Sequence, residues 1–118
     1  SWAIDPWEGR VGHLQGTAWT DTQPGNIALG GHAEYPNGTP GIFHQLATLA
    51  PGDTIMLIDA GQLWHYDVVT ATSVPFDDLS VVYPTETAQL TLITCDIPTY
   101  NTSTGLYDER LVIIAQSQ

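Results

Sequence analysis

The chain has 118 residues, 42% of them hydrophobic, and a formal net charge of -11 that comes from 13 acidic residues against two arginines and no lysine. This length fits one domain with a single core, and the hydrophobic fraction excludes a disordered chain. The scarcity of basic side chains excludes a binding patch for a nucleic-acid backbone, and no apolar run approaches the roughly 18 residues of a membrane span. We therefore expect a single domain over residues 1–118.

Strand signals dominate the chain, and turn-forming residues interrupt them about every ten residues. We expect strands over residues 27–31, 54–59, 63–70, 81–83, 89–95 and 110–115. The only helical spacing lies within residues 43–50 and ends at Pro51-Gly52. Residues 60–62 are expected to form the turn of a hairpin. Short strands with one small helix predict an all-β fold, either a barrel or a sandwich.

The start of the chain and its cysteine content bear on the cellular location of the protein. No signal peptide is visible, and the chain begins with Ser1 rather than Met. This start is typical of a trimmed or processed fragment and is consistent with the removal of an N-terminal anchor. The single cysteine, Cys95, excludes an internal disulfide, and a leftover thiol in a secreted protein is a candidate reactive group.

Three side chains at the ends of predicted strands suit covalent catalysis. Cys95 ends one apolar strand, His32 ends another, and Arg110 begins the last strand. A cysteine nucleophile requires a base or a cation to become a thiolate, and a donor for the oxyanion that forms on the attacked carbonyl. Taken singly, each residue also has a plain structural interpretation, as a buried inert thiol, a loop histidine and a solvated strand-edge cation. Their combination favours a site.

The remaining histidines and acids carry weaker signals. His65 lies in mid-strand and is expected to face solvent, His44 is expected on the polar face of the short helix, and His13 has no distinguishing context. The histidine spacing does not match a metal-ligand set and there is no second cysteine, so neither a metal nor a cofactor is expected. The pair Asp77-Asp78 is better explained as a solvated turn than as a calcium site.

Three segments resemble, in order and spacing, the signature segments of sortases, the cysteine transpeptidases of bacterial cell surfaces. They are NIALGGH (26–32), LTLITC (90–95) and ERLVIIA (109–115). The family's TLxTC strand corresponds to residues 91–95, and residues 41–55 are similar to the family's short helix and following strand. The resemblance runs from residue 11 to the end. It implies a sortase-type closed β-barrel of about seven to eight strands with one or two short helices.

The resemblance also implies a role for individual residues. Cys95 corresponds to the nucleophile, His32 to the family's histidine and Arg110 to its arginine. The implied substrate-binding residues are Thr94, Ala28, Gly31 and Thr85. A sortase cleaves an LPxTG-like sorting signal after its Thr, holds the acyl group on Cys, and passes it to an amine of the cell wall or of a pilin. The loop of residues 96–109 looks closest to class A-like enzymes.

The implied location is the extracellular face of the bacterial membrane, with attachment only through an N-terminal anchor that is absent from this sequence. Sortase domains usually begin with one or two strands before the segment that matches residues 9–19, and eight residues precede it here. The barrel is therefore expected to lack a strand, whether because that piece was cleaved or because another molecule completes the open edge.

Two other interpretations stay open at this point. One is a non-catalytic β-domain that binds glycan or protein, which the four tryptophans and the acidic composition suggest. The other is a cysteine hydrolase on the same scaffold, in which water replaces the amine.

Overall fold

A computed structural model of the chain describes residues 11–14, 16–19, 24–34, 39–59 and 61–118. The strands are β1 (Gly12–His13), β2 (Asn26–Gly30), β3 (Thr54–Asp59), β4 (Gln62–Pro75), β5 (Gln89–Cys95), β6 (Tyr100–Asn101), β7 (Leu106–Tyr107) and β8 (Glu109–Ser117). The short 3-10 helices are η2 (Leu46–Thr48), η3 (Leu79–Val82) and η4 (Ile97–Thr99). The described chain is thus mostly β, which confirms the predicted class.

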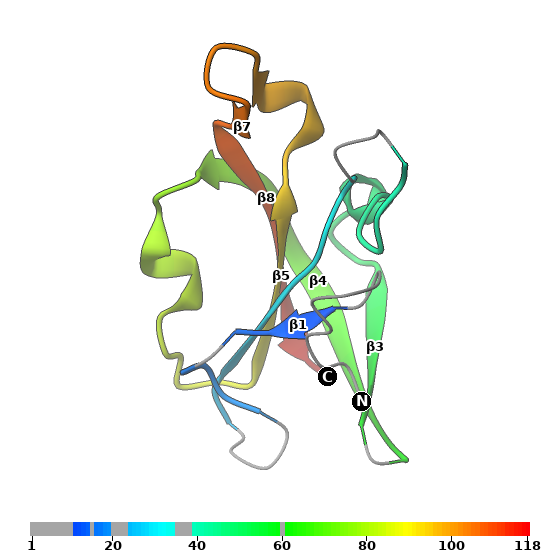
Figure 1. The fold of residues 1–118 in the computed structure, drawn as a ribbon. Helices are drawn as coiled ribbons and strands as arrows, with labels where there is room; N and C mark the ends of the chain where they lie inside the picture. Colours follow the sequence, from blue (N-terminus) through cyan, green and yellow to red (C-terminus); the bar gives the residue numbers. More distant parts are fainter. Residues whose placement is uncertain (1–10, 15, 20–23, 35–38, 60) are drawn as a thin grey trace.

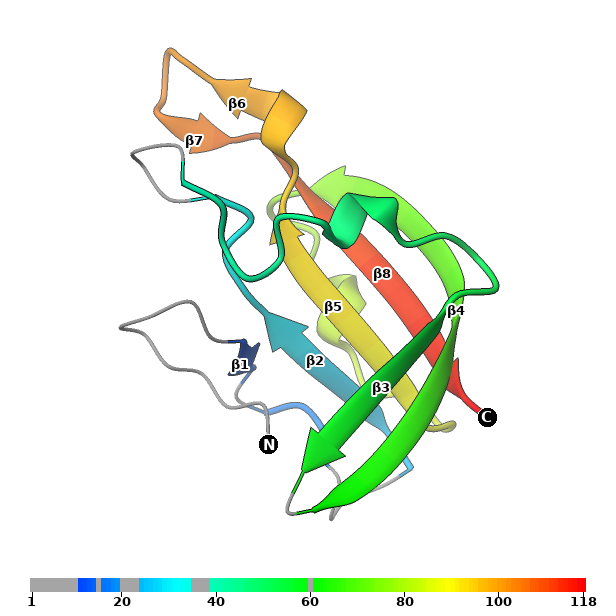
Figure 2. The same cartoon turned by 90° about the vertical axis from the view of Figure 1, so that its right-hand side faces the viewer.

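Six strands form one curled sheet in the order β1-β2-β5-β8-β4-β3, and β6 and β7 form a small hairpin at one end of it (Figures 1 and 2). The β2–β5 pair is parallel, and the other pairs are antiparallel. In the described part of the chain β1 and β3 are the edges of the sheet, and no described strand joins them. The curled sheet fits the expected sortase-type barrel.

The central strands are covered on both faces. Ile27, Ala28 and Leu29 of β2 are 0% exposed, and Leu90 and Thr91 of β5 are buried with them. The segment that contains η3 contacts β2, while the residues around η2 belong to the main hydrophobic cluster. Strands covered on both faces read as continuous apolar runs rather than as alternating ones, which explains the sequence of β2.

The hairpin predicted for residues 54–70 is confirmed by β3 and β4. Its turn contains Gly61 with φ +80°, a conformation that favours glycine. Strand β4 is longer than predicted and continues to Pro75, because β8 runs beside it and pairs Val74 with Arg110 and Pro75 with Glu109. The partner strand, rather than local composition, sets the length of β4.

The strand predicted over residues 81–83 is wrong, because this segment lies in and beside the 3-10 helix η3. The Asp78 carboxylate accepts a hydrogen bond from the Ser80 backbone N–H at 3.0 Å and caps the helix. The Asn26 side chain then donates from Nδ2 to the carbonyls of Val81 and Tyr83, both at 3.0 Å. A side chain 55 residues away in sequence thus takes the place of a strand partner.

The helix predicted within residues 43–50 is present only as a turn followed by η2. Phe43 and Leu46 of this segment are buried, and they place the apolar spacing that suggested a helix against the core. The backbone follows 3-10 geometry, with the Thr48 N–H donating to the Gln45 carbonyl at 2.9 Å. The apolar spacing predicted the buried face correctly but overestimated the length of the helix.

Candidate active site

Cys95 and Arg110 lie directly opposite each other across two strands. Cys95 is the last residue of β5, and the antiparallel β5–β8 register pairs it with Arg110 near the start of β8. Directly paired residues on neighbouring strands project to the same face of a sheet, with Cβ atoms about 5 Å apart. Both side chains are half-buried. The thiol and the guanidinium therefore share one face at the end of the sheet.

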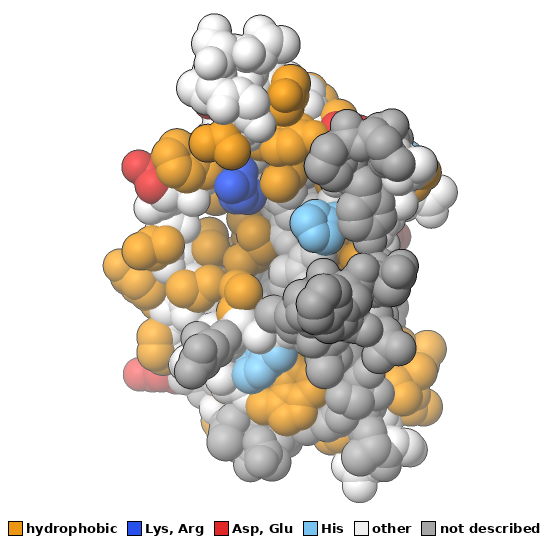
Figure 3. Space-filling view, in the orientation of Figure 1, with side chains coloured by type: hydrophobic (Ala, Val, Ile, Leu, Met, Phe, Trp, Pro, Cys, Tyr) orange, Lys and Arg blue, Asp and Glu red, His pale blue; other side chains and the backbone are white. Residues whose placement is uncertain are grey.

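The Arg110 guanidinium is held by two backbone carbonyls and retains further hydrogen-bond donors. Its Nη1 donates to the carbonyls of Tyr107 at 3.1 Å and Glu109 at 3.3 Å, and its Cζ lies 6.0 Å from the centre of the Phe76 ring. Within the described part of the chain Nε and Nη2 make no hydrogen bond. Figure 3 shows a basic side chain among hydrophobic ones on a face that also carries histidine. The Arg110 guanidinium can therefore still donate hydrogen bonds from Nε and Nη2 to a substrate carbonyl or an oxyanion.

The parallel β2–β5 register carries the His32 segment to the end of β5. Each paired residue of β5 stands 63 positions after its β2 partner, from Asn26 with Gln89 to Gly30 with Ile93. The contact continues beyond the strands, because the Thr94 hydroxyl donates to the Gly31 carbonyl at 2.8 Å. The ladder ends at Gly30 and Ile93, and the same offset of 63 positions would bring His32 opposite Cys95. The segments that carry the three predicted catalytic residues therefore lie at one end of the sheet.

Close backbone packing fixes the exposed His32 on its loop. The Phe43 N–H donates to the His32 carbonyl at 2.9 Å, and the Gly41 N–H donates to the Ala33 carbonyl at 3.0 Å. A Cβ added at Gly41 would lie 2.2 Å from the His32 carbonyl oxygen, and one added at Gly31 would lie 2.9 Å from the Phe43 ring. Both positions favour glycine, because the segment around His32 and the segment around Phe43 approach each other too closely for a side chain.

The other histidines have different surroundings. The Nε2 of His13 lies 2.8 Å from the Ala18 carbonyl oxygen and 2.9 Å from the Thr17 hydroxyl. The Nδ1 of the exposed His44 lies 3.3 Å from a backbone carbonyl oxygen, and His65 on β4 is exposed as expected. None of the three is carried to the end of β5 by the strand registers. The assignment of His32 as the partner of Cys95 stays a prediction, and the β2–β5 register supports it.

An apolar pocket of about 170 Å³ adjoins Arg110. Its walls come from the end of β4, the η3 segment and β5, and its lining residues include Val74, Phe76, Leu79, Val81, Ile93 and Arg110. Ile93 stands two positions before Cys95, so its side chain points to the same face as the thiol. The one lining carboxylate, Asp78, has its pKa lowered by its hydrogen bonds with the Ser80 side chain and backbone. The pocket suits an apolar group attached to a peptide that reaches Cys95.

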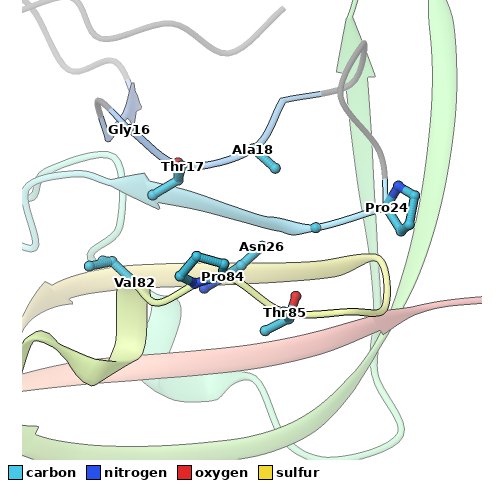
Figure 4. A pocket seen from close by; sticks show the side chains of 9 residues that line it. Gly16, Thr17, Ala18, Pro24, Asn26, Val82, Pro84 and Thr85 are labelled. Atoms are coloured by element: carbon cyan, nitrogen blue, oxygen red, sulfur yellow. The ribbon is translucent and has the colours of Figure 1, made fainter.

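A second pocket, of about 330 Å³, lies near the starts of β2 and β5. Figure 4 shows its walls: Thr17 and Ala18 from the segment before β2, and Val82, Pro84 and Thr85 from the segment before β5. Val82 also lines the first pocket, so the two cavities share a wall.

The four predicted substrate-binding residues have different positions. Thr85 lines the second pocket and not the first, and Ala28 is fully buried in β2. Thr94 is 3% exposed, and its hydroxyl joins β5 to the carbonyl of the half-buried Gly31. Their substrate-binding roles stay predictions.

Tyr107 is part of this region, although the sequence did not single it out. Its hydroxyl donates to the Glu34 carboxylate at 2.5 Å. That hydrogen bond, then burial and the negative charges of Glu34 and of the Cys95 thiolate, raises the pKa of the Tyr107 phenol to about 12. The only sequence signal for this residue is its place on the loop between Cys95 and Arg110.

Neither a metal site nor a membrane helix is found in the described residues. No group of three or more His, Cys, Asp or Glu side chains among them is arranged to hold a metal ion. Their helices are all too short or too polar to cross a bilayer.

A family model described as the Sortase domain matches residues 3–118. The chain belongs to the sortase family. This sortase is 35% identical over 78 residues to sortase A of Listeria monocytogenes, a match that covers 66% of this chain and 34% of the relative.

Solved sortases share the fold. A lid mutant of sortase A from Corynebacterium diphtheriae matches with a TM-score of 0.77 and 25% identity, covering 98% of this chain and 60% of that one. The solved sortase A of Listeria monocytogenes matches with a TM-score of 0.67 and 30% identity, covering 86% and 66% of the two chains. This sortase thus spans about a third of the curated relative and less than two thirds of the Corynebacterium chain.

Proposed function

We propose that this sortase is a cysteine transpeptidase that cleaves an LPxTG-like sorting signal after its Thr and transfers the acyl group to an amine. The observation that carries the proposal is the direct pairing of Cys95 with Arg110, with the His32 segment hydrogen-bonded to the residue before Cys95. A thiol, an imidazole and an anchored guanidinium at one end of a rigid sheet are the groups that acyl transfer through a thioester requires.

The reaction has two halves. The Cys95 thiolate attacks the Thr carbonyl carbon, and Arg110 donates hydrogen bonds to the oxygen on which negative charge develops. His32, as imidazolium, gives its proton to the departing amine as the C–N bond breaks, and a thioester remains on Cys95. Neutral His32 then takes a proton from the incoming amine, which attacks the thioester. A new C–N bond forms, the C–S bond breaks, and the Cys95 thiolate is released.

The apolar pocket beside Arg110 would hold the hydrophobic part of the sorting signal. Val74, Leu79 and Ile93 present apolar side chains to it, and Arg110 forms its border with the reacting end of the sheet. A peptide with its apolar residue in the pocket has its backbone beside the guanidinium. Thr94 and Gly31 then support the groove from behind, since their hydrogen bond joins β5 to the end of β2.

The acceptor in this proposal is an amine of the cell wall or of a pilin, and the biological outcome is surface-protein anchoring or pilus assembly at the outer face of the membrane. The net charge of -11 favours the approach of cationic amines over anionic partners at low salt. In this proposal the amine approaches between the segments that follow His32 and Cys95.

Product analysis tests the proposal. The protein is incubated with an LPxTG-type peptide at fixed pH, with and without millimolar triglycine or a diamino-acid peptide, and the products are separated by chromatography. We expect cleavage after Thr, and a shift from free acid to ligated peptide as the amine concentration rises. His32→Gln should remove both products, whereas the matched control His65→Gln, at an exposed position on β4, should retain them.

Two outcomes would replace the proposal with another function. Free acid alone at every amine concentration would indicate a cysteine hydrolase on the sortase scaffold. No cleavage of any sorting-type peptide, with Cys95 unmodified, would indicate a non-catalytic binding domain.

A further inference from the structure

Tyr107 contacts two parts of the candidate site, one through its side chain and one through its backbone. Its hydroxyl donates to Glu34, which stands two residues after His32, and its backbone carbonyl accepts from Nη1 of Arg110. One residue therefore contacts both the loop that carries the candidate base and the candidate oxyanion donor. The β6–β7 hairpin that bears Tyr107 lies at the same end of the molecule as the segment after β2 (Figures 1 and 2).

The hairpin side of this connection is firmly attached to the sheet. The Asp96 N–H donates to the Glu109 carbonyl at 3.1 Å, and the Asp108 N–H donates to the Thr99 carbonyl at 3.1 Å. The Tyr107 ring packs edge-on against the Tyr100 ring, with centroids 5.1 Å apart. The direction of the Tyr107 side chain is thus set by the hairpin.

The His32 side lies just beyond the strand ladder of the sheet. Strand β2 ends at Gly30, and His32 and Glu34 lie beyond the ladder. Backbone hydrogen bonds join this segment to its own continuation, from the Phe43 N–H to the His32 carbonyl and from the Gly41 N–H to the Ala33 carbonyl, and a bridge pairs Glu34 with Pro40. The Tyr107–Glu34 hydrogen bond ties this segment sideways to the hairpin between Cys95 and Arg110.

We propose that Tyr107 is a positioning residue for the transfer reaction, holding the His32 segment through its hydroxyl and Arg110 through its carbonyl so that both groups stay aligned on Cys95. The proposal rests on the proposed function of this site. A displacement of about 1 Å in the groups around a reacting atom is enough to cost a large factor in rate, so such a tether acts on kcat rather than on substrate binding. The Tyr107 phenol remains protonated, and so remains a hydrogen-bond donor, at neutral pH, because the hydrogen bond to Glu34 raises the pKa of the phenol to about 12.

Tyr107→Phe tests the proposal with a matched control in the same hairpin. The variant keeps the ring and loses only the hydroxyl. Tyr100→Phe makes the same change at an exposed tyrosine whose hydroxyl makes no hydrogen bond within the described residues. We expect Tyr107→Phe to lower kcat per titrated active site about tenfold with KM for the sorting peptide little changed, and Tyr100→Phe to behave like the wild type.

Changes at Glu34 separate positioning from general destabilisation. Glu34→Gln keeps a side-chain oxygen that accepts from the phenol, so it should retain more activity than Glu34→Ala. The double variant Tyr107→Phe with Glu34→Ala should lose no more than Glu34→Ala alone, because both changes remove the same bond. Additive losses would contradict the tether.

A readout without catalysis uses the two arginines of the chain. Their Nε–H groups give two side-chain NMR signals, and Arg110→Lys assigns the one that belongs to Arg110. We expect Tyr107→Phe to shift or broaden the Arg110 signal, and Tyr100→Phe to leave it in place.

Three results would overturn the proposal: equal kcat for the two Tyr→Phe variants, an unmoved Arg110 signal in Tyr107→Phe, or a lower unfolding midpoint with kcat per active site unchanged. Failure of the proposed function is a separate outcome. In that case the wild type forms no acyl adduct, and the NMR comparison still decides whether Tyr107 positions Arg110.

Discussion

The Asn26 side chain holds the wall of the apolar pocket to the sheet, and its removal has a calculable cost. Asn26 is 2% exposed, and its two donor hydrogens go to the carbonyls of Val81 and Tyr83. Its Oδ1 accepts from the Thr91 hydroxyl at 2.6 Å, and Thr91 is 0% exposed. Asn26→Ala therefore leaves one fully buried donor without its acceptor, and it releases two carbonyls that lie nearer the surface.

The expected loss of stability follows from these partners. A buried donor left without a partner costs about 1–3 kcal/mol, and the net worth of each ordinary hydrogen bond is about 1 kcal/mol. Water can replace part of the bonds to Val81 and Tyr83, so we expect Asn26→Ala to lower the free energy of unfolding by about 2–4 kcal/mol. Thr91→Val removes the hydroxyl that Asn26→Ala leaves without an acceptor. The double variant should therefore lose about 1–2 kcal/mol less in free energy of unfolding than the sum of the losses of the two single variants.

Urea unfolding followed by tryptophan fluorescence measures these differences at fixed pH. Thr72→Val is the matched control, because Thr72 is exposed on β4 and its hydroxyl makes no hydrogen bond within the described residues. A loss below about 0.5 kcal/mol for Asn26→Ala, or strict additivity of the pair, would refute the reasoning. With activity established, Asn26→Ala should also raise KM for the sorting peptide, since the η3 segment forms one wall of the pocket.

Three further predictions concern the reacting end of the sheet. Arg110→Lys should lose most activity while the fold survives, because an ammonium cannot bind the two carbonyls and a substrate as a planar fork does; retention of more than about a third of kcat/KM, a loss under about 0.7 kcal/mol, would contradict it. Gly41→Ala should lower the unfolding midpoint and kcat together, because the new methyl would meet the His32 carbonyl; an unchanged midpoint by thermal melting would contradict the packing. The phenol of Tyr107 has a folded pKa of about 12 against an ordinary value of 10, so its contribution to stability is complete below pH 10 and is lost between pH 10 and 12. The difference in unfolding free energy between wild type and Tyr107→Phe should shrink over that interval, and a constant difference would contradict the bond to Glu34.

Much of the fold was predictable because its signals are local. The turn signal at residues 60–62 and the strand-forming runs on either side of it predicted the β3–β4 hairpin. The apolar run that ends at Cys95 predicted β5. These segments satisfy their backbone hydrogen bonds with near neighbours in sequence or with long partner strands, so short windows carry the information.

The errors have long-range causes. Residues 81–83 are apolar and β-branched enough to predict a strand, but the carbonyls of Val81 and Tyr83 bond to the side chain of Asn26. The β6–β7 hairpin was not predicted because its strands have only two residues each. Local pattern cannot reveal a partner 55 residues away.

The candidate site was predictable in its residues more than in its geometry. Cys95, His32 and Arg110 stood out because each lies at the end of a predicted strand, and the β5–β8 register explains why Cys95 and Arg110 meet. The Tyr107–Glu34 bond was not predictable, because it joins β7 to the segment after β2, 73 residues apart, through side chains that no periodicity marks.

The central claim is that Cys95 carries the acyl group. Intact-protein mass spectrometry after brief incubation with an LPxTG-type peptide, quenched in acid, measures it most directly. We expect an added mass equal to the peptide up to and including its Thr, less water, located on Cys95, absent from Cys95→Ala and discharged by a millimolar amine. An unmodified wild-type mass under conditions where a solved sortase A forms its adduct, or an adduct that persists in Cys95→Ala, would contradict it.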